Sequence, residues 1–285
     1  METGHAVYDR WVKQCAFPVL GANIVDNKTG EPYLTPYKII ERKGVKIAVL
    51  GMITPAIPSW LPEQLWNGLH FEDMEDCARK WVKIIKEKEN PDVLIGLFHA
   101  GPEGNKLDNV VENGSGDVAK NVPGFDVVFM GHDHVRRCEK IVNVAGDSVL
   151  LVDPANAARY VSDVTVKVTK AGGKLVRKSV EGAWADVSRY AADEDFMREF
   201  AGQYQATVDF VSRKIGRIEE TITTKDAYLG PSAFIDLLHQ LQLDITGADI
   251  SFCAPLSFSA EIKKGDIYMS DMFLSLIHIS EPTRH

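Results

Sequence analysis

The sequence has few cysteines, no long apolar run and no excess of positive charge. Lysine and arginine total 32 against 40 aspartates and glutamates, a net charge of −8, which argues against binding to a nucleic acid polymer. No apolar segment approaches the ~20 residues that a membrane-spanning helix needs. The four cysteines are widely spaced, so they indicate neither a zinc site nor a disulfide framework, and we expect mostly buried small side chains at Cys15, Cys77, Cys138 and Cys253.

The composition is that of a globular protein large enough for a substantial core. Hydrophobic residues make up 45% and charged residues 25% of the 285 positions. At roughly 150 residues per domain, the length predicts about two domains. The chain contains no internal repeat and no low-complexity segment, and nothing in it sets the oligomeric state.

The N-terminus does not resemble the start of a protein. Residues 1–10 lack the basic and apolar regions of a signal peptide. An amphipathic run through Val7, Trp11 and Val12 begins almost at once, as in the middle of a domain. We therefore interpret Met1 as an internal methionine of a longer protein.

Hydrophobic periodicity predicts a layered α/β domain. Residues 71–88 have apolar side chains at helical spacing, and residues 38–50 alternate around a turn as a hairpin does. Short apolar runs predict buried strands at 93–98 and 127–130. Later strands are expected at 148–152 and 161–169, after which residues 190–213 form a helical linker and a second domain begins near Gly216.

Histidines follow two of the predicted buried strands. His99 ends the run 93–98, and Gly131-His132-Asp133-His134 follows the run 127–130. The carboxyl ends of buried strands are where α/β sheets place their ligand sites, and neutral imidazole binds zinc, manganese, iron or cobalt well. Gly131 is expected to let the backbone turn tightly into the site. We expect surface or core positions for four of the other five histidines, which are His5, His70, His239 and His278.

These motifs resemble those of the calcineurin-like metallophosphoesterases, in the group of 5′-nucleotidases and 2′,3′-cyclic-nucleotide phosphodiesterases. The resemblance covers residues 1–273 and comprises these segments: Ala22-Asn23-Ile24, His99-Ala100-Gly101, Gly131-His132-x-His134, Phe234–Gln240 and Gly247–Ile250. Glu31–Ile40, Cys253–Ser257 and the histidine at 134 favour the branch of cyclic phosphodiesterases and 3′-nucleotidases. A 5′-nucleotidase or UDP-sugar hydrolase of the same group and a non-catalytic nucleotide-binding homologue remain alternatives.

The resemblance implies a mechanism and a set of metal ligands. Two divalent metal ions, whether zinc, manganese, iron or cobalt, would clamp the phosphate for in-line attack. His99 and His132 would bind the second ion and His134 the first. The substrate would be a 2′,3′-cyclic nucleotide, opened to the 3′-nucleotide and then dephosphorylated to the nucleoside. The resemblance also implies a periplasmic or extracellular protein, and it assigns no substrate-binding residue.

Family comparison also suggests that part of the site lies elsewhere. The fold class implied is an incomplete metallophosphoesterase domain followed by the start of a second α/β, nucleotide-binding domain. We expect the C-terminal part of the first domain at 1–188, the linker helix at 189–214 and the start of the second domain at 215–273. The remaining metal ligands and the catalytic histidine would precede residue 1, so no catalytic residue is assigned and this stretch alone is expected to be inactive.

The last residues have a different origin in this interpretation. Residues 274–285 match the translation of a sequencing-library adapter over eleven codons. We interpret them as a read-through product, so His278 is not a candidate ligand.

Three further features of the sequence indicate ordinary structural roles. A basic run predicts a solvated hairpin rather than a phosphate or nucleic acid contact, and comprises Lys167, Lys170, Lys174, Arg177 and Lys178. Gly114-Ser115-Gly116-Asp117 lacks the preceding strand and the lysine of a P-loop, so a flexible loop is expected. Core or interdomain packing is expected for Trp60, Trp66 and Trp81.

Overall fold

The computed structural model describes residues 3–104, 106–107, 110–253, 255 and 257–276. The chain divides into two compact units, Met1–Tyr190 and Ala191–His285. Most of the segment interpreted as read-through, 277–285, lies outside the described residues. The finer domain boundaries stay a prediction.

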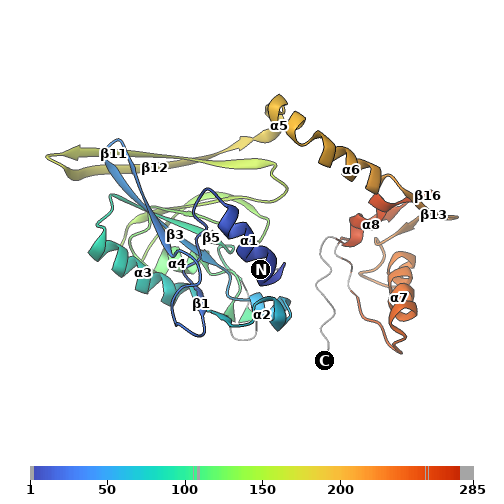
Figure 1. Ribbon diagram of the computed structural model, residues 1–285. Coiled ribbons are helices and arrows are strands. Elements are labelled where there is room, and N and C mark those ends of the chain that lie inside the picture. The colour runs from blue at the N-terminus through green and yellow to red at the C-terminus, as the bar shows by residue number, and fades with distance from the viewer. Residues whose placement is uncertain (1–2, 105, 108–109, 254, 256, 277–285) are drawn as a thin grey trace. The chain divides into compact units, whose positions relative to one another are not determined.

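A six-stranded mixed sheet forms the centre of the first unit (Figure 1). Its four inner strands run parallel and its two edge strands run antiparallel to their neighbours. In spatial order the strands are β2 (Tyr37–Arg42), β3 (Val45–Ile53), β5 (Val93–His99), β8 (Val127–Phe129), β10 (Ser148–Pro154) and β9 (Arg136–Val142). The sheet confirms the predicted α/β class, including the hairpin and the two buried strands that end near histidines.

Two helices cover one face of this sheet. The longer, α3 (Met74–Lys88), begins three residues later than its periodicity suggested, because Asp73 caps it by accepting hydrogen bonds from the N–H groups of Glu75 and Asp76. Its buried face joins that of α4 (Ser115–Asn121) and the sheet in one core. The helix at 115–121 corrects the expected flexible loop. Ser115 is fully buried there and its hydroxyl donates to the Ala100 carbonyl at 2.8 Å.

A long hairpin covers the opposite face. It consists of β11 (Tyr160–Ala171) and β12 (Lys174–Asp186). Alternate side chains of the central strands point towards it, because successive residues of a strand face opposite sides of the sheet. The resulting apolar layer contains Val127, Leu150 and Val152 from the sheet and Val164, Val166 and Val180 from the hairpin.

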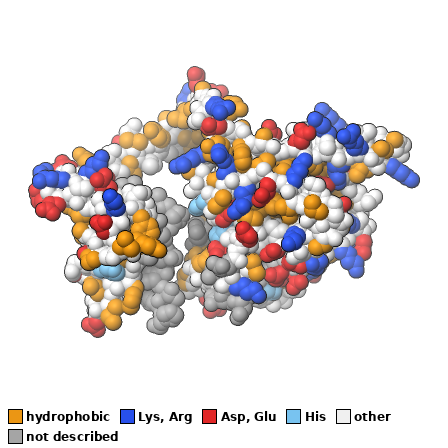
Figure 2. All heavy atoms as spheres, turned by 180° about the vertical axis from the view of Figure 1, so that it is seen from behind, with side chains coloured by type: hydrophobic (Ala, Val, Ile, Leu, Met, Phe, Trp, Pro, Cys, Tyr) orange, Lys and Arg blue, Asp and Glu red, His pale blue; other side chains and the backbone are white. Residues whose placement is uncertain are grey.

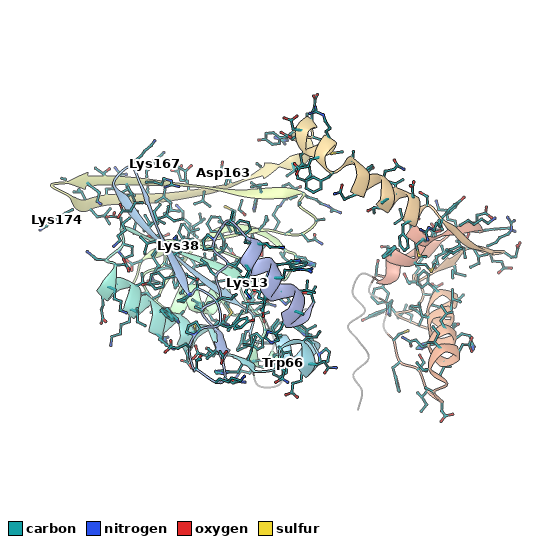
Figure 3. The ribbon with its side chains drawn as sticks, in the orientation of Figure 1. Lys13, Lys38, Trp66, Asp163, Lys167 and Lys174 are labelled. Carbon is teal, nitrogen blue, oxygen red and sulfur yellow. The ribbon has the colours of Figure 1, made fainter. Side chains whose placement is uncertain are left out.

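Two lysines of the basic run attach this hairpin to the sheet. Lys170 Nζ lies 2.7 Å from Asp92 Oδ2, and Lys178 Nζ lies 2.6 Å from Asp126 Oδ1. Other basic side chains gather at the free end of the hairpin (Figure 2), where Lys167 and Lys174 extend outward (Figure 3). Part of the basic run therefore has a defined structural role.

Smaller elements complete the first unit. They are α1 (Gly4–Gln14), β1 (Ile24–Asp26), α2 (Ile57–Trp60), the 3-10 helix η1 (Glu63–Leu65), β4 (Leu69–Phe71), β6 (Lys106–Leu107), β7 (Val110–Val111) and the 3-10 helix η2 (Val187–Arg189). Strands β1 and β4 pair beside α1 over a second, smaller core around Ile24, Leu34 and Leu69. All four cysteines are free thiols; Cys77 is buried and the other three are half-buried.

The second unit contains four helices and two short strand pairs among its described residues. Its elements are α5 (Glu194–Glu199), α6 (Ala201–Val211), β13 (Lys214–Ile218), β14 (Ile222–Thr223), α7 (Ala233–Thr246), β15 (Glu261–Ile262), β16 (Gly265–Tyr268) and α8 (Met269–Leu276). Strand β13 pairs with β16, and β14 pairs with β15. Across both units, none of the helices in the described ranges combines the length and the hydropathy needed to span a membrane.

The hairpin attachment predicts a pH-dependent loss of stability. Lys170→Met should lower the free energy of unfolding by about 1 kcal/mol or less at pH 7, as for a partly exposed ion pair. The hydrogen bond from Lys170 holds the pKa of Asp92 below its usual range. The contribution is therefore present above the ordinary aspartate pKa of about 4 and is lost as pH falls through the lowered value. Urea denaturation should show the two proteins converging below about pH 4, whereas the exposed control Lys167→Met changes nothing.

The connection from β10 to β11 predicts a stabilising glycine. Ala155, Ala157 and Ala158 have φ values of 63°, 60° and 51°, a left-handed backbone that costs a non-glycine residue roughly 1–2 kcal/mol. Ala158 is exposed, so Ala158→Gly loses no packing and should raise the free energy of unfolding by up to about 1 kcal/mol. The control Ala6→Gly, in helix α1, should lower it by roughly 0.5–1 kcal/mol. Destabilisation by both changes would contradict the left-handed conformation.

Candidate metal centre

Two of the three predicted ligand histidines meet at the carboxyl edge of the sheet. Strands β5 and β8 pair in parallel with Leu97 opposite Phe129, so His99 lies level with the turn that begins at Gly131. The rings of His99 and His132 contact each other edge to face, with centroids 5.3 Å apart. Parallel register thus places two imidazoles from distant segments side by side.

The turn after β8 holds its histidines in an unusual backbone conformation. His132 and His134 have φ values of 82° and 61°, in the left-handed region that non-glycine residues rarely adopt. Gly131, expected to allow the turn, has no positive φ. A Cβ atom there would lie 3.7 Å from His99 Nδ1, an ordinary contact. The strain falls on the histidines themselves, a pattern that concentrates at functional sites.

His132 is held on three sides. Its ring packs against that of Trp60, with centroids 5.0 Å apart and planes inclined by 30°. The His99 ring contacts the His132 ring edge to face, and Nε2 of His132 lies 2.9 Å from Glu112 Oε1. Both partners of that hydrogen bond are about three-quarters shielded from solvent.

Two buried asparagines form hydrogen bonds with the backbone at the strand ends around the histidines. Asn23, from the Ala22-Asn23-Ile24 motif, accepts from the Ile53 N–H and donates to the Ile53 carbonyl at the end of β3. Asn113 Oδ1 accepts from the Gly101 N–H at 2.5 Å, two residues beyond His99. A Cβ atom on Gly101 would lie 2.9 Å from both Asn113 and Asp133, so only glycine allows the turns to approach this closely.

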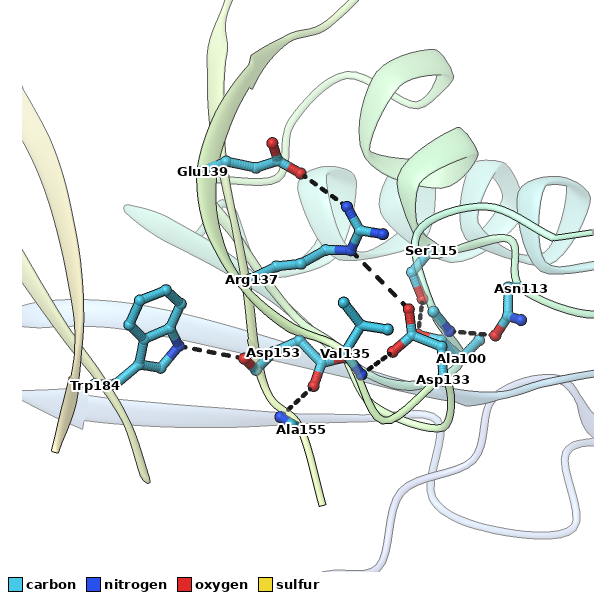
Figure 4. A network of polar contacts seen from close by, with 11 residues as sticks. Ala100, Asn113, Ser115, Asp133, Val135, Arg137, Glu139, Asp153, Ala155 and Trp184 are labelled. Carbon is cyan, nitrogen blue, oxygen red and sulfur yellow. Dashed lines mark hydrogen bonds and ion pairs between the residues drawn. The ribbon is translucent and has the colours of Figure 1, made fainter. Parts of the chain in front are cut away.

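Two carboxyl groups accept backbone hydrogen bonds at this edge of the sheet, Asp133 within the histidine turn and Asp153 at the end of β10 (Figure 4). Asp133 accepts from the Val135 N–H at 3.0 Å, and Asp153, at the end of β10, accepts from the Ala155 N–H at 2.8 Å. Arg137 lies near Asp133, with 4.0 Å between Nε and Oδ2. Each carboxyl group therefore fixes one turn at the carboxyl edge of the sheet.

Burial makes Asp153 a weaker acid than an exposed aspartate. Its side chain is fully buried, and this burial raises its pKa to about 6, with the negative charge of Asp133 acting in the same direction. Arg137 acts in the opposite direction. The Asp153 carboxyl group therefore stays neutral up to a higher pH than an exposed aspartate does.

The donor set fits part of a divalent metal site. Two adjacent imidazoles suit a borderline cation such as zinc or manganese. Within the described ranges, however, no group of three or more histidine, cysteine, aspartate or glutamate side chains is arranged to hold a metal ion. The three-ligand assignment to His99, His132 and His134 stays a prediction.

The other histidines have local partners. His5 hydrogen-bonds to Tyr33 and to the Asn67 carbonyl, His70 to Asn27, and His239 to Ser251. His278 and His285 lie outside the described residues.

Sequence reasoning overlooked three residues at this edge. Glu112 and Asp153 belong to no motif, and Trp60 was assigned to core or interdomain packing. The contacts of Glu112 and Trp60 with His132 span 20 and 72 residues of sequence, and only the fold brings them together. For Asp153 a signal existed, because a carboxylate ends the apolar run 149–152 as a histidine ends the run 93–98.

Neutralising Asp153 should remove one component of the pH dependence of stability. A folded-state pKa of about 6 exceeds the ordinary value of about 4, so the folded state binds more protons and the free energy of unfolding falls as pH rises from about 4 to 6. Asp153→Asn keeps an acceptor for the Ala155 N–H and should be about 1–3 kcal/mol more stable than the wild type at pH 8. Urea denaturation at several pH values measures this. Asp163→Asn, on the exposed face of β11, should retain the wild-type profile.

Comparison with known proteins gives related enzymes over most of the chain. No protein-family model matches the sequence. A 2′,3′-cyclic-nucleotide 2′-phosphodiesterase/3′-nucleotidase of Haemophilus influenzae is 25% identical over 256 residues, which cover 81% of this chain and 39% of that protein. A 5′-nucleotidase of Vibrio cholerae is 33% identical over 124 residues, 43% of this chain and 22% of that protein. The chain thus spans less than half the length of these relatives.

Solved structures share the fold. A putative 5′-nucleotidase from Staphylococcus aureus superposes with a TM-score of 0.76 at 19% identity, covering 97% of this chain and 54% of that one. The calcineurin-like phosphoesterase YfkN from Bacillus subtilis gives a TM-score of 0.61 at 22% identity, covering 74% and 68%. The resemblance deduced from the motifs is confirmed: the chain is similar in sequence to 2′,3′-cyclic-nucleotide phosphodiesterase/3′-nucleotidases and 5′-nucleotidases, and it shares the fold of a calcineurin-like phosphoesterase.

Proposed function

We propose that this protein hydrolyses nucleotide phosphoesters with divalent metal ions, opening 2′,3′-cyclic nucleotides to 3′-nucleotides and then releasing the phosphate. The observation that carries the proposal is the contact between the His99 and His132 rings at the carboxyl edge of the sheet. The similarity to a phosphodiesterase/3′-nucleotidase over 81% of the chain supports the reaction class.

In this proposal His99 and His132 hold one divalent ion and His134 holds a second. A divalent ion at this edge would stabilise the negative charge that develops on the phosphate. The left-handed backbone at His132 and His134 fixes the direction in which both imidazoles leave the turn. Asn23, Asn113 and Asp133 keep the surrounding strand ends in place, so the imidazoles are ordered before any ion binds.

The 5′-nucleotidases are the nearest alternative for the substrate. They share the fold, and one of them is 33% identical to part of this chain. His134 favours the cyclic-nucleotide branch, because many 5′-nucleotidases are expected to carry glutamine or asparagine there. A periplasmic or extracellular location remains the prediction of the resemblance.

The proposal predicts a specific loss of activity on removal of one imidazole. In the protein expressed from its complete reading frame, His132→Ala should lower kcat/KM for 2′,3′-cyclic AMP by at least the ~10–100-fold typical of disturbed metal sites. Phosphate and nucleoside release should be measured with manganese present, using 3′-AMP and 5′-AMP as competing substrates. The matched control is His70→Ala, which removes an exposed imidazole that hydrogen-bonds to Asn27, away from the candidate ligands.

Three outcomes separate the possibilities. Equal activity of the His132→Ala variant and the wild type would contradict the metal assignment. Preferential turnover of 5′-AMP would replace the proposed substrate with that of the 5′-nucleotidases. Nucleotide binding without turnover by the complete protein would indicate the non-catalytic homologue.

A further inference from the structure

Glu112 links the two segments that carry the candidate ligands. It lies between β7 and α4, and its Oε1 is 2.9 Å from Nε2 of His132. The next residue, Asn113, is buried and accepts a hydrogen bond from the N–H of Gly101, beside His99. The backbone that presents Glu112 is therefore fixed to the turn after β5, while its side chain reaches the turn after β8.

The contact determines which nitrogen of His132 is available. A carboxylate only accepts hydrogen bonds, so Nε2 must carry the proton and donate to Glu112. In a neutral imidazole the other nitrogen, Nδ1, then keeps a free lone pair. A metal-binding histidine commonly donates its second N–H to a carboxylate, which fixes the tautomer and the orientation of the ring.

The remaining contacts of His132 leave the ring little freedom. Trp60 packs against the ring with an interplanar angle of 30°, and His99 contacts it edge to face. A 180° rotation of the ring about its Cβ–Cγ bond would put Cε1 in the place of Nε2 and break the hydrogen bond to Glu112. Three neighbours therefore specify both the plane of the ring and its tautomer.

We propose that Glu112 is a positioning residue that holds His132 in the Nε2-protonated tautomer and so makes Nδ1 the nitrogen that binds the metal ion. The inference rests on the proposed function, since it concerns the same site. It adds a residue that no motif contains, and it assigns a specific atom of His132 to the cation.

The tautomer is measurable without metal. Long-range proton–nitrogen NMR spectra of the whole 285-residue chain distinguish the two tautomers, and a His132→Asn sample identifies the His132 signals. The wild type should show the Nε2-protonated form. Glu112→Ala should show a mixture of tautomers, whereas Glu112→Gln, which retains an acceptor, should stay close to the wild type. Glu103→Gln, an exposed acid in the same loop, is the matched control and should change nothing.

Metal affinity provides the second measurement. Manganese is the probe because it binds thiols weakly, which avoids the four free cysteines. The complete protein is titrated with manganese, and binding is followed by electron paramagnetic resonance. The manganese affinity should be about 10–100-fold lower for Glu112→Ala than for the wild type, with Glu112→Gln between them.

The outcomes separate this inference from the function it rests on. A wild type with the Nδ1-protonated tautomer, or a Glu112→Ala variant that matches the wild type in both tautomer and manganese affinity, would overturn the role of Glu112 alone. If the complete protein neither binds manganese nor hydrolyses nucleotides, the proposed function fails, whichever tautomer is found. A large loss of manganese affinity in Glu112→Ala without any change of tautomer would make Glu112 a direct ligand and overturn the positioning role.

Discussion

Parallel pairing of β5 with β8 is the constraint on which the candidate site depends. Backbone hydrogen bonds fix Leu97 opposite Phe129, so the residues that follow both strands emerge at one level. A shift of register by one residue would turn His99 to the opposite face of the sheet. The apolar layers on both faces prevent such a shift, because it would also expose their buried side chains. The position of two imidazoles is thus secured by a core that contains neither of them.

The same edge of the sheet carries most of the left-handed non-glycine backbone among the described residues of the first unit, together with a fully buried carboxyl group. Left-handed histidines and left-handed alanines lie in the turns that follow β8 and β10, and the buried carboxyl group of Asp153 lies at the end of β10. Each of these features costs free energy, which the extensive core must offset. Their concentration at one edge fits a site whose geometry is maintained against the local preferences of the chain.

Strong local patterns predicted much of this structure from the sequence. Uninterrupted apolar runs predicted the buried strands, because a strand covered on both faces needs apolar side chains on both. The histidines that follow these runs were therefore expected at the strand ends, where the structure places them. The helix at 115–121 was missed, since its Gly-Ser-Gly start has low helical propensity and burial against Ala100 stabilises it instead. Glu112 and Trp60 could not be assigned to His132, because their contacts join segments that only tertiary structure brings together. The left-handed conformation of two histidines likewise has no local signature.

The attachment of the β11–β12 hairpin has a consequence for the order in which the chain folds. The hairpin pairs two strands that are consecutive in the chain, so its contacts join residues that are close in sequence. Its attachment is remote, because Lys170 donates to the Gly44 carbonyl across 126 positions and Lys178 to the Asp92 carbonyl across 86. Closing such long loops is slow relative to local pairing. The hairpin would therefore form before the central sheet is complete. Until the sheet forms, the side chains of Val164, Val166 and Val180, which the sheet later covers, would be exposed to solvent.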